Sequence, residues 1–379
     1  MQKNNLQFPI LPPQTIGIIG GGQLGRMMAI AARYMGYNII VLDPTPNCPT
    51  AQVSDLQITA PYDDMDAIKE LAEKADVITY EFENVDLEAA RYIEGKGKLP
   101  QGAYALEVTQ NREAEKTLMR EANIPVAPFS IVRNGEECRE ALQTIDLPAV
   151  IKTCRGGYDG KGQLKIESEA EIEAAVQFAE QDGTFIIEQW INFDKEISVV
   201  FTRSLDGEIT YFPLAENIHR DHILAETYAP AHVSETVKEK ALHAAKVLAE
   251  KINVVGTFAI EMFVKGDEIY INEMAPRPHN SGHYTIESCN VSQFSQHIRA
   301  ICRLPLPEVE QRQEALMINI LGEDLKRALL ALKEIPQASI HLYGKAEAKE
   351  KRKMGHVTFT ANTYEELITL KQAYEEDLL

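Results

Sequence analysis

Two glutamates among apolar neighbours, Glu261 and Glu273, are the residues of this sequence best suited to catalytic chemistry. Glu261 lies within the apolar run 257–264, and Glu273 follows a second run at 268–271. A strand that buries a carboxylate in such company needs a cation to offset the cost of removing the charge from water. Magnesium held by two carboxylates and by the phosphates of a substrate meets that need. We therefore expect Glu261 and Glu273 to hold one or two Mg²⁺ ions at the end of a β-hairpin.

The loop of this hairpin decides whether the two carboxylates share a face, because side chains alternate along a strand. A regular two-residue turn at 266–267 would place them on opposite faces. A three-residue loop at 265–267 would pair Glu261 with Ile271 and leave Glu273 as the diagonal neighbour, roughly 7–8 Å away. We predict that loop, or a bulge with the same effect. The apolar flanks disfavour the alternative, two surface glutamates without a role.

The segment 271–288, INEMAPRPHNSGHYTIES, continues the hairpin with further polar side chains. Arg277 can grip a planar, carboxylate-like group with two parallel hydrogen bonds. His279 is a candidate proton acceptor, because histidine titrates near neutral pH. Two alternatives stay open for it, a hydrogen-bond donor and a structural histidine.

A first glycine segment, GGGQLG at 20–25, stands between an expected strand and an expected helix, with Asp43 at the end of the next strand. This is the pattern of a dinucleotide-binding turn, so a nicotinamide-dependent dehydrogenase is one interpretation. Glycines that serve only a tight turn are another. We favour a third, in which the helix N-terminus receives an anionic substrate without any dinucleotide. A dehydrogenase would leave the downstream carboxylates and glycines unused.

A second glycine segment, 156–162, follows Lys152. It differs from a Walker phosphate loop, since Gly162 stands where serine or threonine should follow Lys161. Strands are expected on both of its sides, so it is predicted to be a hairpin flap whose backbone N–H groups cover a nucleotide's phosphates. Lys152 would neutralise phosphate charge. An exposed hairpin without a ligand is the alternative.

The elements around these segments predict an α/β and α+β protein. Strands alternate with helices over 15–107, which indicates a parallel, doubly wound, Rossmann-like sheet. We place the domains at 1–108, 109–305, with a mobile lid at about 125–190, and 306–379, a small C-terminal αβ domain. The expected strands and helices are 15–19, 23–34, 38–42, 77–80, 111–122, 149–153, 163–166, 169–180, 185–190 and 235–251, with an antiparallel pair turning at 206–207.

Composition excludes several classes of protein. The chain has 379 residues, 45% of them hydrophobic, which is ample for a globular core. Its 38 lysines and arginines against 57 aspartates and glutamates, a net charge of −19, argue against nucleic acid or a membrane as partner. The five cysteines are odd in number and form no CxxC, so free thiols are expected. Without an apolar run of membrane-spanning length or a signal-peptide pattern, we expect a cytoplasmic protein.

Five motifs together resemble those of a known family. They are GGGQLGRM at 20–27, YEFENV at 80–85, GGYDGKGQ at 156–163, NEMAPRPHNSGHYT at 272–285 and GHVT at 355–358. The features from 152 to 282 resemble the ATP-grasp superfamily, and the five blocks resemble its family of N5-carboxyaminoimidazole ribonucleotide synthetases. The resemblance implies that ATP phosphorylates bicarbonate to carboxyphosphate, whose carbon dioxide passes to the exocyclic amine of aminoimidazole ribonucleotide. A homodimer is the expectation that accompanies this family.

The resemblance also implies roles for individual residues. The residues implied for the bicarbonate and carboxyphosphate pocket are Arg277, His279 and Asn280. Those implied for the ATP site are Arg112, Lys152, Gly157, Tyr158, Asp159, Gly160, Lys161, Gly162, Gln163, Glu188, Gln189, Trp190, Ile191, Glu196, His219, Asn272 and Glu273, with Glu196 on the ribose hydroxyls. Those implied for the ribonucleotide are Glu81, Tyr158, Asp159 and Lys161, with Lys345 and Arg352 on its 5′-phosphate.

Two further functions stay open beside this one. Another ATP-grasp ligase could use formate and glycinamide ribonucleotide, or carboxylate biotin. A nucleotide-binding regulator without catalysis would use the same glycine flap. By composition alone, moreover, the run 345–353 would be a solvated charged loop.

Overall fold

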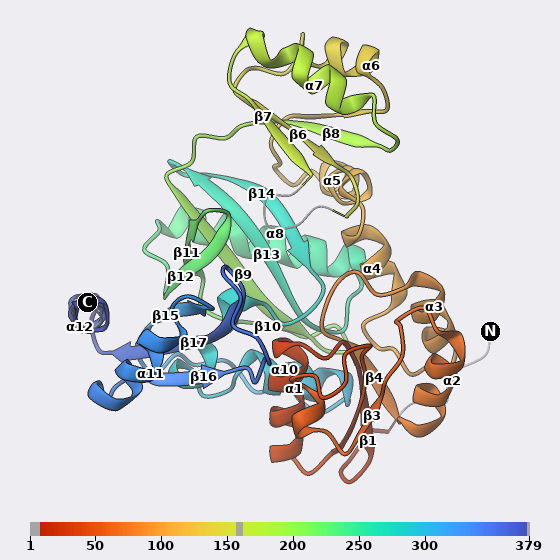
Figure 1. The fold of residues 1–379 in the computed structure, drawn as a ribbon, viewed down its shortest axis with the longest axis vertical. Coiled ribbons are helices and arrows are strands. Elements are labelled where there is room, and N and C mark those ends of the chain that lie inside the picture. Colours follow the sequence, from red (N-terminus) through yellow and green to blue (C-terminus); the bar gives the residue numbers. More distant parts are fainter. Residues whose placement is uncertain (1–7, 157–161, 377–379) are drawn as a thin grey trace.

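The structure, a computed structural model, describes residues 8–156 and 162–376. Figure 1 shows an N-terminal unit (red to orange), a small antiparallel sheet with two helices at the top, a central sheet, and a C-terminal segment in blue. The mixed α/β class predicted from the sequence is confirmed.

The N-terminal unit is a four-stranded parallel sheet in the order β3-β2-β1-β4. Its strands are β1 (Thr15–Ile19), β2 (Asn38–Leu42), β3 (Leu56–Ile58) and β4 (Val77–Tyr80), and its helices are α1 (Gln23–Tyr34), α2 (Met65–Lys74), α3 (Leu87–Gly95) and α4 (Ala103–Thr109), with a 3₁₀ turn η1 (Ala51–Val53). Helices cover both faces of the sheet, which is why β1 and β4 are continuous apolar runs. The carboxyl ends of β1 and β4 carry the glycine segment and Glu81.

A helix and a small sheet follow. Helix α5 (Arg112–Glu121) begins at Asn111, whose side chain accepts a hydrogen bond from the N–H of Glu113. The sheet is antiparallel, in the order β5-β8-β6-β7. Its elements are β5 (Phe129–Val132), α6 (Gly135–Ala141), β6 (Ala149–Thr153), β7 (Gln163–Ile166), η2 (Glu169–Glu171), α7 (Ile172–Ala179) and β8 (Phe185–Gln189). The helix predicted at 169–180 therefore starts as a 3₁₀ turn. We call the small sheet, together with α6, η2 and α7 but without α5, the lid.

The central sheet has nine strands, in the order β14-β13-β9-β11-β12-β15-β17-β16 with β10 paired to β9. Its first strands are β9 (Lys195–Arg203), β10 (Ile209–Tyr211), β11 (Ala215–Arg220), β12 (Ile223–Ala229), β13 (Gly256–Lys265) and β14 (Glu268–Ala275). One face of β9 and β13 is apolar and packs on helix α8 (Glu235–Ile252). The opposite face carries Glu196, Ser198 and Glu261, so the alternation of side chains separates core from site.

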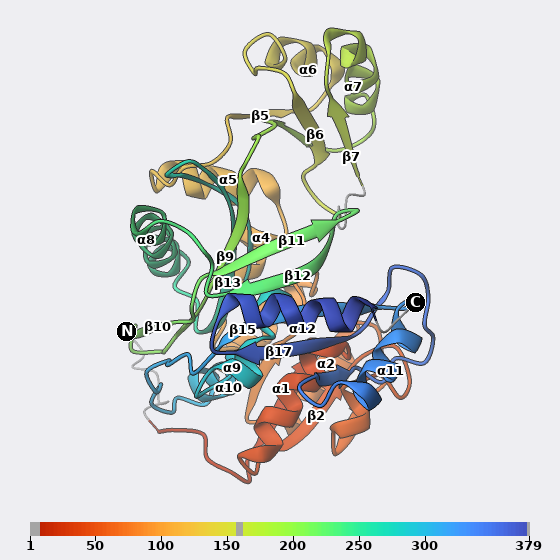
Figure 2. The same cartoon turned by 90° about the vertical axis from the view of Figure 1, so that its left-hand side faces the viewer.

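The C-terminal segment extends the central sheet instead of forming a sheet of its own. Its strands are β15 (Glu314–Leu321), β16 (Ser339–Leu342) and β17 (Lys353–Ala361), and β15 pairs with β12. The remaining helices are η3 (Asn280–Gly282), α9 (Thr285–Ser288), α10 (Gln293–Ile301), α11 (Leu325–Glu334) and α12 (Tyr364–Glu376). Figure 2 shows α12 lying along β17, where an apolar cluster joins the two.

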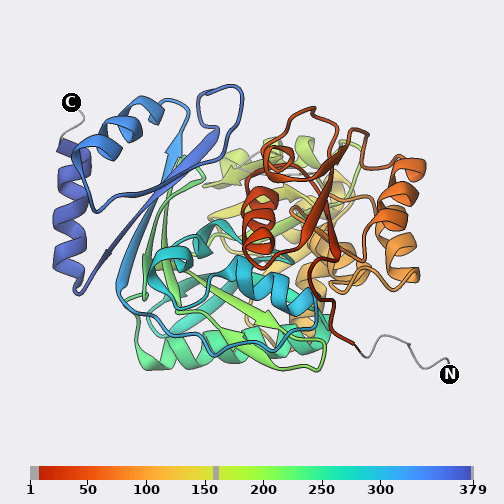
Figure 3. The same ribbon diagram turned by 90° about the horizontal axis from the view of Figure 1, so that it is seen from below.

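The N-terminal unit and the C-terminal segment also touch each other. Seen from below in Figure 3, the blue C-terminal segment stands next to the red N-terminal unit, with the loop after β16 reaching toward that unit. The Gln52 side chain donates to the carbonyl of Gly344 at 2.8 Å across this junction. Sites can therefore form where all three parts meet.

Candidate active site

Glu261 and Glu273 lie directly opposite each other on neighbouring strands. The hairpin between β13 and β14 pairs Lys265 with Glu268, so its turn has two residues, and the predicted three-residue loop is wrong. The register shifts between Glu261 and Met262, which leaves Asn272 as an extra residue, a β-bulge. The bulge was the stated alternative to the loop. It moves Glu273 from the core face, where Ile271 lies, to the face of Glu261.

Helix α5 braces this bulge from the side. A bulge leaves backbone groups without a partner in the sheet ladder. Lys116 Nζ donates to the carbonyl of Ile271 at 3.0 Å, and Glu115 Oε1 accepts from the N–H of Met274 at 2.7 Å. Both side chains are almost fully buried. They therefore supply hydrogen-bond partners for the backbone groups of the strand on each side of Asn272 and Glu273.

The pair of carboxylates suits a divalent cation. Burial, and then the charge of Glu273, raises the pKa of Glu261 to about 7. Arg112 is only a distant partner, with Nη1 3.9 Å from Glu273 Oε2. Over residues 8–156 and 162–376, no cluster of three or more His, Cys, Asp or Glu side chains is arranged to hold a metal. Two carboxylates that need further oxygen ligands match the way Mg²⁺ binds together with nucleotide phosphates.

Two residues predicted for the nucleotide meet on the neighbouring strands. The Nδ1 of His219 on β11 lies 2.5 Å from Glu196 Oε2 on β9. Burial lowers the pKa of His219, but the contact of its ring with the accepting Glu196 carboxylate and the charge of Glu261 outweigh burial and raise the pKa overall. Glu196 is thus placed beside the carboxylate pair, on the same face of the sheet.

A buried ion-pair network links the lid to helix α5. Glu188 on β8 contacts Lys152 at 2.7 Å and Lys116 at 2.9 Å. Burial alone would raise the pKa of Glu188, but the two ammonium groups hold it below its usual range. Lys152 keeps 18% of its side chain exposed, so it can still face a ligand. The Lys116 side chain is only 1% exposed, so it contributes to the ion-pair network from the protein interior.

The rest of the predicted nucleotide residues lie around this network. Gln163 pairs with Lys152 in the β6–β7 hairpin, and the Gly162 carbonyl accepts from the N–H of Thr153 at 2.9 Å. Trp190 follows β8, with Lys165 Nζ 4.5 Å from its ring centre. Gln189 ends β8, and Ile191 comes directly after Trp190. Five predicted residues lie outside the described part of the chain: Gly157, Tyr158, Asp159, Gly160 and Lys161.

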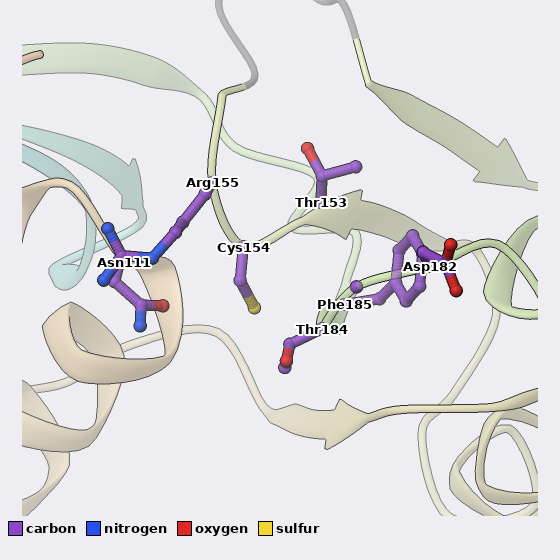
Figure 4. A pocket seen from close by; sticks show the side chains of 8 residues that line it. Asn111, Thr153, Cys154, Arg155, Asp182, Thr184 and Phe185 are labelled. Atoms are coloured by element: carbon purple, nitrogen blue, oxygen red, sulfur yellow. The ribbon is translucent and has the colours of Figure 1, made fainter.

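A cavity of about 360 Å³ opens where the lid meets α5. Figure 4 shows Arg155 reaching toward Asn111 at the start of the helix, with Cys154 and Thr184 beside them. The N–H of Arg112 donates to the carbonyl of Cys154 at 3.0 Å, which ties the helix to the end of β6. The cavity is lined by chain neighbours of Arg112 and Lys152, but by none of the residues predicted to hold a nucleotide.

The loop after β14 carries the three residues predicted for the bicarbonate pocket. Arg277 Nε lies 2.7 Å from Glu83 Oε2 of the N-terminal unit. His279 Nε2 lies 3.3 Å from Glu261 Oε1, beside the carboxylate pair. Asn280 and Asn319 exchange two amide hydrogen bonds, at 3.0 and 2.9 Å. Of the three, His279 contacts Glu261, Arg277 is close enough to Glu273 to be affected by its charge, and Asn280 is held by Asn319.

The first glycine segment is already occupied by side chains of the protein. Glu81 accepts hydrogen bonds from the N–H groups of Gly22 and Gly25, and Asp43 accepts from Gly21 at 2.7 Å. A Cβ on Gly22 would lie 2.6 Å from the Glu81 carboxylate, so glycine is needed there. The Glu81 side chain takes two of the N–H groups at this helix end, and our expectation that the helix end receives an anionic substrate stays a prediction. The same contacts disfavour the pyrophosphate of a dinucleotide there.

Lys345 is brought near Glu81 by the junction between the two end segments, and Arg352 lies near Lys345. Lys345 Nζ donates to the carbonyl of Lys353 at 2.7 Å, and Arg352 Nη1 donates to that of Glu347 at 3.1 Å. Burial, together with the charge of Arg352, lowers the pKa of Lys345 to about 8, and Glu81 opposes this shift. A cationic corner thus faces the glycine segment.

The sequence did not identify several residues that belong to the site. Glu83 is the partner of Arg277 and stands in the YEFENV motif, so the motif was a usable signal. Lys353 acts electrostatically on Glu261, His219 and His279, yet by composition it belongs to a solvated run. Nothing in the sequence singles out the braces Glu115 and Lys116.

Comparisons with known proteins agree with this architecture. Models of the ribonucleotide synthetase pre-ATP-grasp domain, the ATP-grasp domain and the phosphoribosylaminoimidazole carboxylase C-terminal domain match residues 13–110, 117–294 and 315–369. The N5-carboxyaminoimidazole ribonucleotide synthase of Bacillus subtilis is 49% identical, over 95% of this chain and 94% of that protein.

Two solved structures are similar over nearly their whole length. The Staphylococcus aureus N5-carboxyaminoimidazole synthetase complexed with ADP has a TM-score of 0.91 and 41% identity, covering 97% of this chain and 98% of the other. The Aspergillus clavatus N5-carboxyaminoimidazole synthase in complex with ADP and aminoimidazole ribonucleotide has a TM-score of 0.88 and 34% identity, covering 96% and 98%.

Proposed function

Because the chain belongs to the family of N5-carboxyaminoimidazole ribonucleotide synthetases, we propose that it uses ATP to carboxylate 5-aminoimidazole ribonucleotide on its exocyclic amine, in purine biosynthesis. It is an ATP-dependent ligase of the ATP-grasp superfamily that forms a carbon–nitrogen bond. The observation that carries the proposal is the adjacency of the Glu261–Glu273 pair to the loop with Arg277 and His279. Phosphoryl transfer and carbon transfer would therefore take place next to each other.

The first step is the transfer of the ATP γ-phosphoryl group to bicarbonate, giving ADP and carboxyphosphate. Lys152 and Arg112 would lie along the phosphates, with the flap 157–163 above them. Glu196 would hold the ribose, beside His219, and 188–191 would border the adenine. Glu261 and Glu273, with Asn272 beside Glu273 in the bulge of β14, would hold Mg²⁺, which would neutralise charge on the transferring group. Arg277 would grip the planar bicarbonate through its guanidinium.

The second step is the attack of the ribonucleotide's amine on the carbon released from carboxyphosphate. The carbon–phosphate oxygen bond breaks, phosphate leaves, a nitrogen–carbon bond forms and the amine loses a proton. Arg277, His279 and Asn280 would surround the carbon. Glu81, Tyr158, Asp159 and Lys161 would orient the ribonucleotide, and Lys345 and Arg352 would bind its 5′-phosphate. Carboxyphosphate is short-lived, so closure of the lid over the site would protect it from water.

A substrate test distinguishes this proposal from the nearest alternative. We expect ADP release to require both aminoimidazole ribonucleotide and bicarbonate, and ¹³C from bicarbonate to appear as a carbamate carbon on the ribonucleotide. Equal ADP release with formate and glycinamide ribonucleotide would contradict the proposal. ADP release that ignores both ribonucleotides would point to a nucleotide-binding regulator.

We extend the proposal to a homodimer in the cytoplasm, following the expectation from the family resemblance. Sedimentation of the protein, with and without Mg-ATP, would test the dimer. No helix within residues 8–156 and 162–376 is long and apolar enough to cross a membrane.

A further inference from the structure

A row of buried polar side chains runs from His279 into the protein. Ser281 Oγ lies 2.8 Å from His279 Nδ1 and accepts from Ser198 Oγ at 2.7 Å. The Asn217 amide donates to Ser198 Oγ at 3.0 Å, and the Thr227 hydroxyl donates to Asn217 Oδ1 at 3.0 Å. The four residues behind His279 are at most 4% exposed. The hydrogen bonds of each therefore have to be made within the row.

The backbone of Ser281 settles which ring nitrogen of His279 is without a hydrogen. Its N–H lies 3.3 Å from Nδ1, where His279 caps the 3₁₀ turn η3. A backbone N–H can only donate, so Nδ1 must present its lone pair. The Ser281 hydroxyl accepts from Ser198, which leaves its own hydrogen for Nδ1 as well. Two donors thus converge on this one nitrogen.

The other ring nitrogen then carries the hydrogen. His279 Nε2 lies 3.3 Å from Glu261 Oε1, an acceptor. Because Nδ1 accepts a hydrogen bond, the ring cannot be an imidazolium, which carries a hydrogen on both nitrogens. A neutral imidazole whose Nδ1 accepts has its single hydrogen on Nε2.

The backbone of His279 is held as firmly as its ring. The fully buried Gln293 on α10 accepts from the N–H of His279 at 2.9 Å and donates to its carbonyl at 2.7 Å. A Cβ on Gly282 would lie 2.5 Å from the Gln293 oxygen, so the turn is packed closely against this amide. The ring therefore has little freedom to exchange its hydrogen-bond partners.

From this arrangement we propose that Ser281, Ser198 and Asn217 are positioning residues that hold His279 as the Nε2–H tautomer. His279 is then a hydrogen-bond donor at the site and is not the base that takes the proton of the amine. The inference rests on the proposed function for its catalytic meaning. In the free protein the donor faces Glu261, and an oxygen of the carbon-bearing substrate would be its partner during turnover. Of the two functional roles considered for His279 from its sequence, proton acceptor and hydrogen-bond donor, this selects the donor.

The tautomer can be observed directly in the free protein. We would label histidine with ¹⁵N and identify the His279 signals by their loss in His279→Gln. We expect one ring nitrogen with a bonded hydrogen, Nε2, and a bare Nδ1. A hydrogen on Nδ1, or signals averaged between the two tautomers, would overturn the proposal. This outcome does not depend on the reaction that the protein catalyses.

Turnover of two substitutions separates a donor from a base. Glutamine offers an amide N–H near the position of Nε2 but cannot take a proton at neutral pH, whereas alanine offers neither. We expect His279→Gln to stay within about 10-fold of the wild-type kcat, the size of one perturbed hydrogen bond. His279→Ala, which removes the hydrogen-bond donor altogether, should lose about 100-fold or more. Equal, large losses in both variants would show that His279 acts as a base.

The row itself is tested by Ser281→Ala and Ser198→Ala, with Thr202→Val as the matched control. Thr202 lies on the same strand and face as Ser198, is fully buried, and shares a hydrogen bond of 2.8 Å with Thr257. We expect both serine variants to shift the Nδ1 signal of His279 and to lower kcat. Thr202→Val should change the melting temperature without either effect. Identical spectra in the serine variants and the wild type would overturn the role of the row.

Discussion

Glu261 and Glu273 form a direct cross-strand pair only because Asn272 bulges out of the strand between Ile271 and Glu273. If Asn272 instead took a regular place in the ladder, opposite Glu261, Glu273 would continue the alternation of Ile269 and Ile271 and point at helix α8. The bulge therefore converts a buried, core-facing position into a site position. Removing water from two like charges at this spacing creates the demand for a cation.

Deleting Asn272 should leave Glu261 and Glu273 on one face. The deletion closes the bulge and gives a regular two-residue hairpin, in which Met262 still pairs with Ile271 and Glu261 with Glu273. We expect an ADP-release assay to show turnover within about 10-fold of the wild type, the size of one perturbed hydrogen bond.

Glu273→Gln is the matched comparison, because it keeps the bulge and removes the charge. Circular dichroism and the melting temperature should show that both variants are folded before turnover is compared. We expect Glu273→Gln to abolish ADP formation, and unchanged turnover would contradict the role of the carboxylate pair. If the deletion variant were folded but inactive, the Asn272 side chain or the bulge itself would be required.

Much of the fold was predictable because its signals are local. The bounds of β1, α1, β2, β4, β6 and β7 agree with the residues predicted, since each element ends at a glycine, proline or polar cluster. The fold class followed from the order of these elements. The hairpin's two carboxylates were also visible, since charged residues in apolar runs are unusual.

The remainder of the site depends on contacts that are distant in the sequence. Asn272 is an ordinary strand residue until Glu115 and Lys116, far earlier in the chain, are seen to satisfy the backbone around it. The glycine segment is typical of an anion site, and only the folded chain shows that Glu81 takes two of its N–H groups. Periodicity and motifs carry no information about such partners.

Lys116→Met should destabilise the protein strongly. Lys116 is 1% exposed and lies 2.9 Å from Glu188, so its loss leaves that buried carboxylate with only Lys152 and frees the carbonyl of Ile271. Removing one member of a buried ion pair costs about 3–5 kcal/mol. Urea denaturation would measure the loss of unfolding free energy.

Lys69→Met is the matched control for this substitution. Its ion pair with Asp66 has the same 2.9 Å separation, but both side chains are exposed. Exposed pairs contribute about 0–1 kcal/mol. If the two lysine variants were equally stable, the buried network would contribute nothing beyond a surface pair.

Glu261→Gln should stabilise the free protein at alkaline pH. The folded pKa of Glu261 is raised to about 7 by burial and by Glu273, from an ordinary value of 4.5. Between these values the folded state keeps a proton that the unfolded chain has lost, so wild-type stability falls as pH rises through this window. Glutamine does not titrate, so the substituted protein does not lose stability as pH rises through this window. At pH 8, without magnesium or nucleotide, we expect a gain on the order of 1–3 kcal/mol.

The gain should disappear at pH 4, where wild-type Glu261 is protonated in both states. Glu268→Gln is the control on the same hairpin, since its side chain is 64% exposed and pairs with Lys240. Thermal melts at both pH values measure the difference. If the Glu261→Gln protein were no more stable than the wild type at pH 8, the charge of Glu261 would not destabilise the folded protein.

Lys345 should make binding of the ribonucleotide sensitive to alkaline pH. Burial and Arg352 lower its pKa to about 8, so the ammonium loses its proton above that pH and can no longer attract a phosphate. We expect the KM for aminoimidazole ribonucleotide to rise about 10-fold from pH 7 to pH 9, as one charge-assisted hydrogen bond is lost. Lys345→Arg should remove the rise because a guanidinium stays charged. Lys349→Met, in the exposed part of the same loop, should leave it unchanged. A rise that persists in Lys345→Arg would place the titrating group elsewhere.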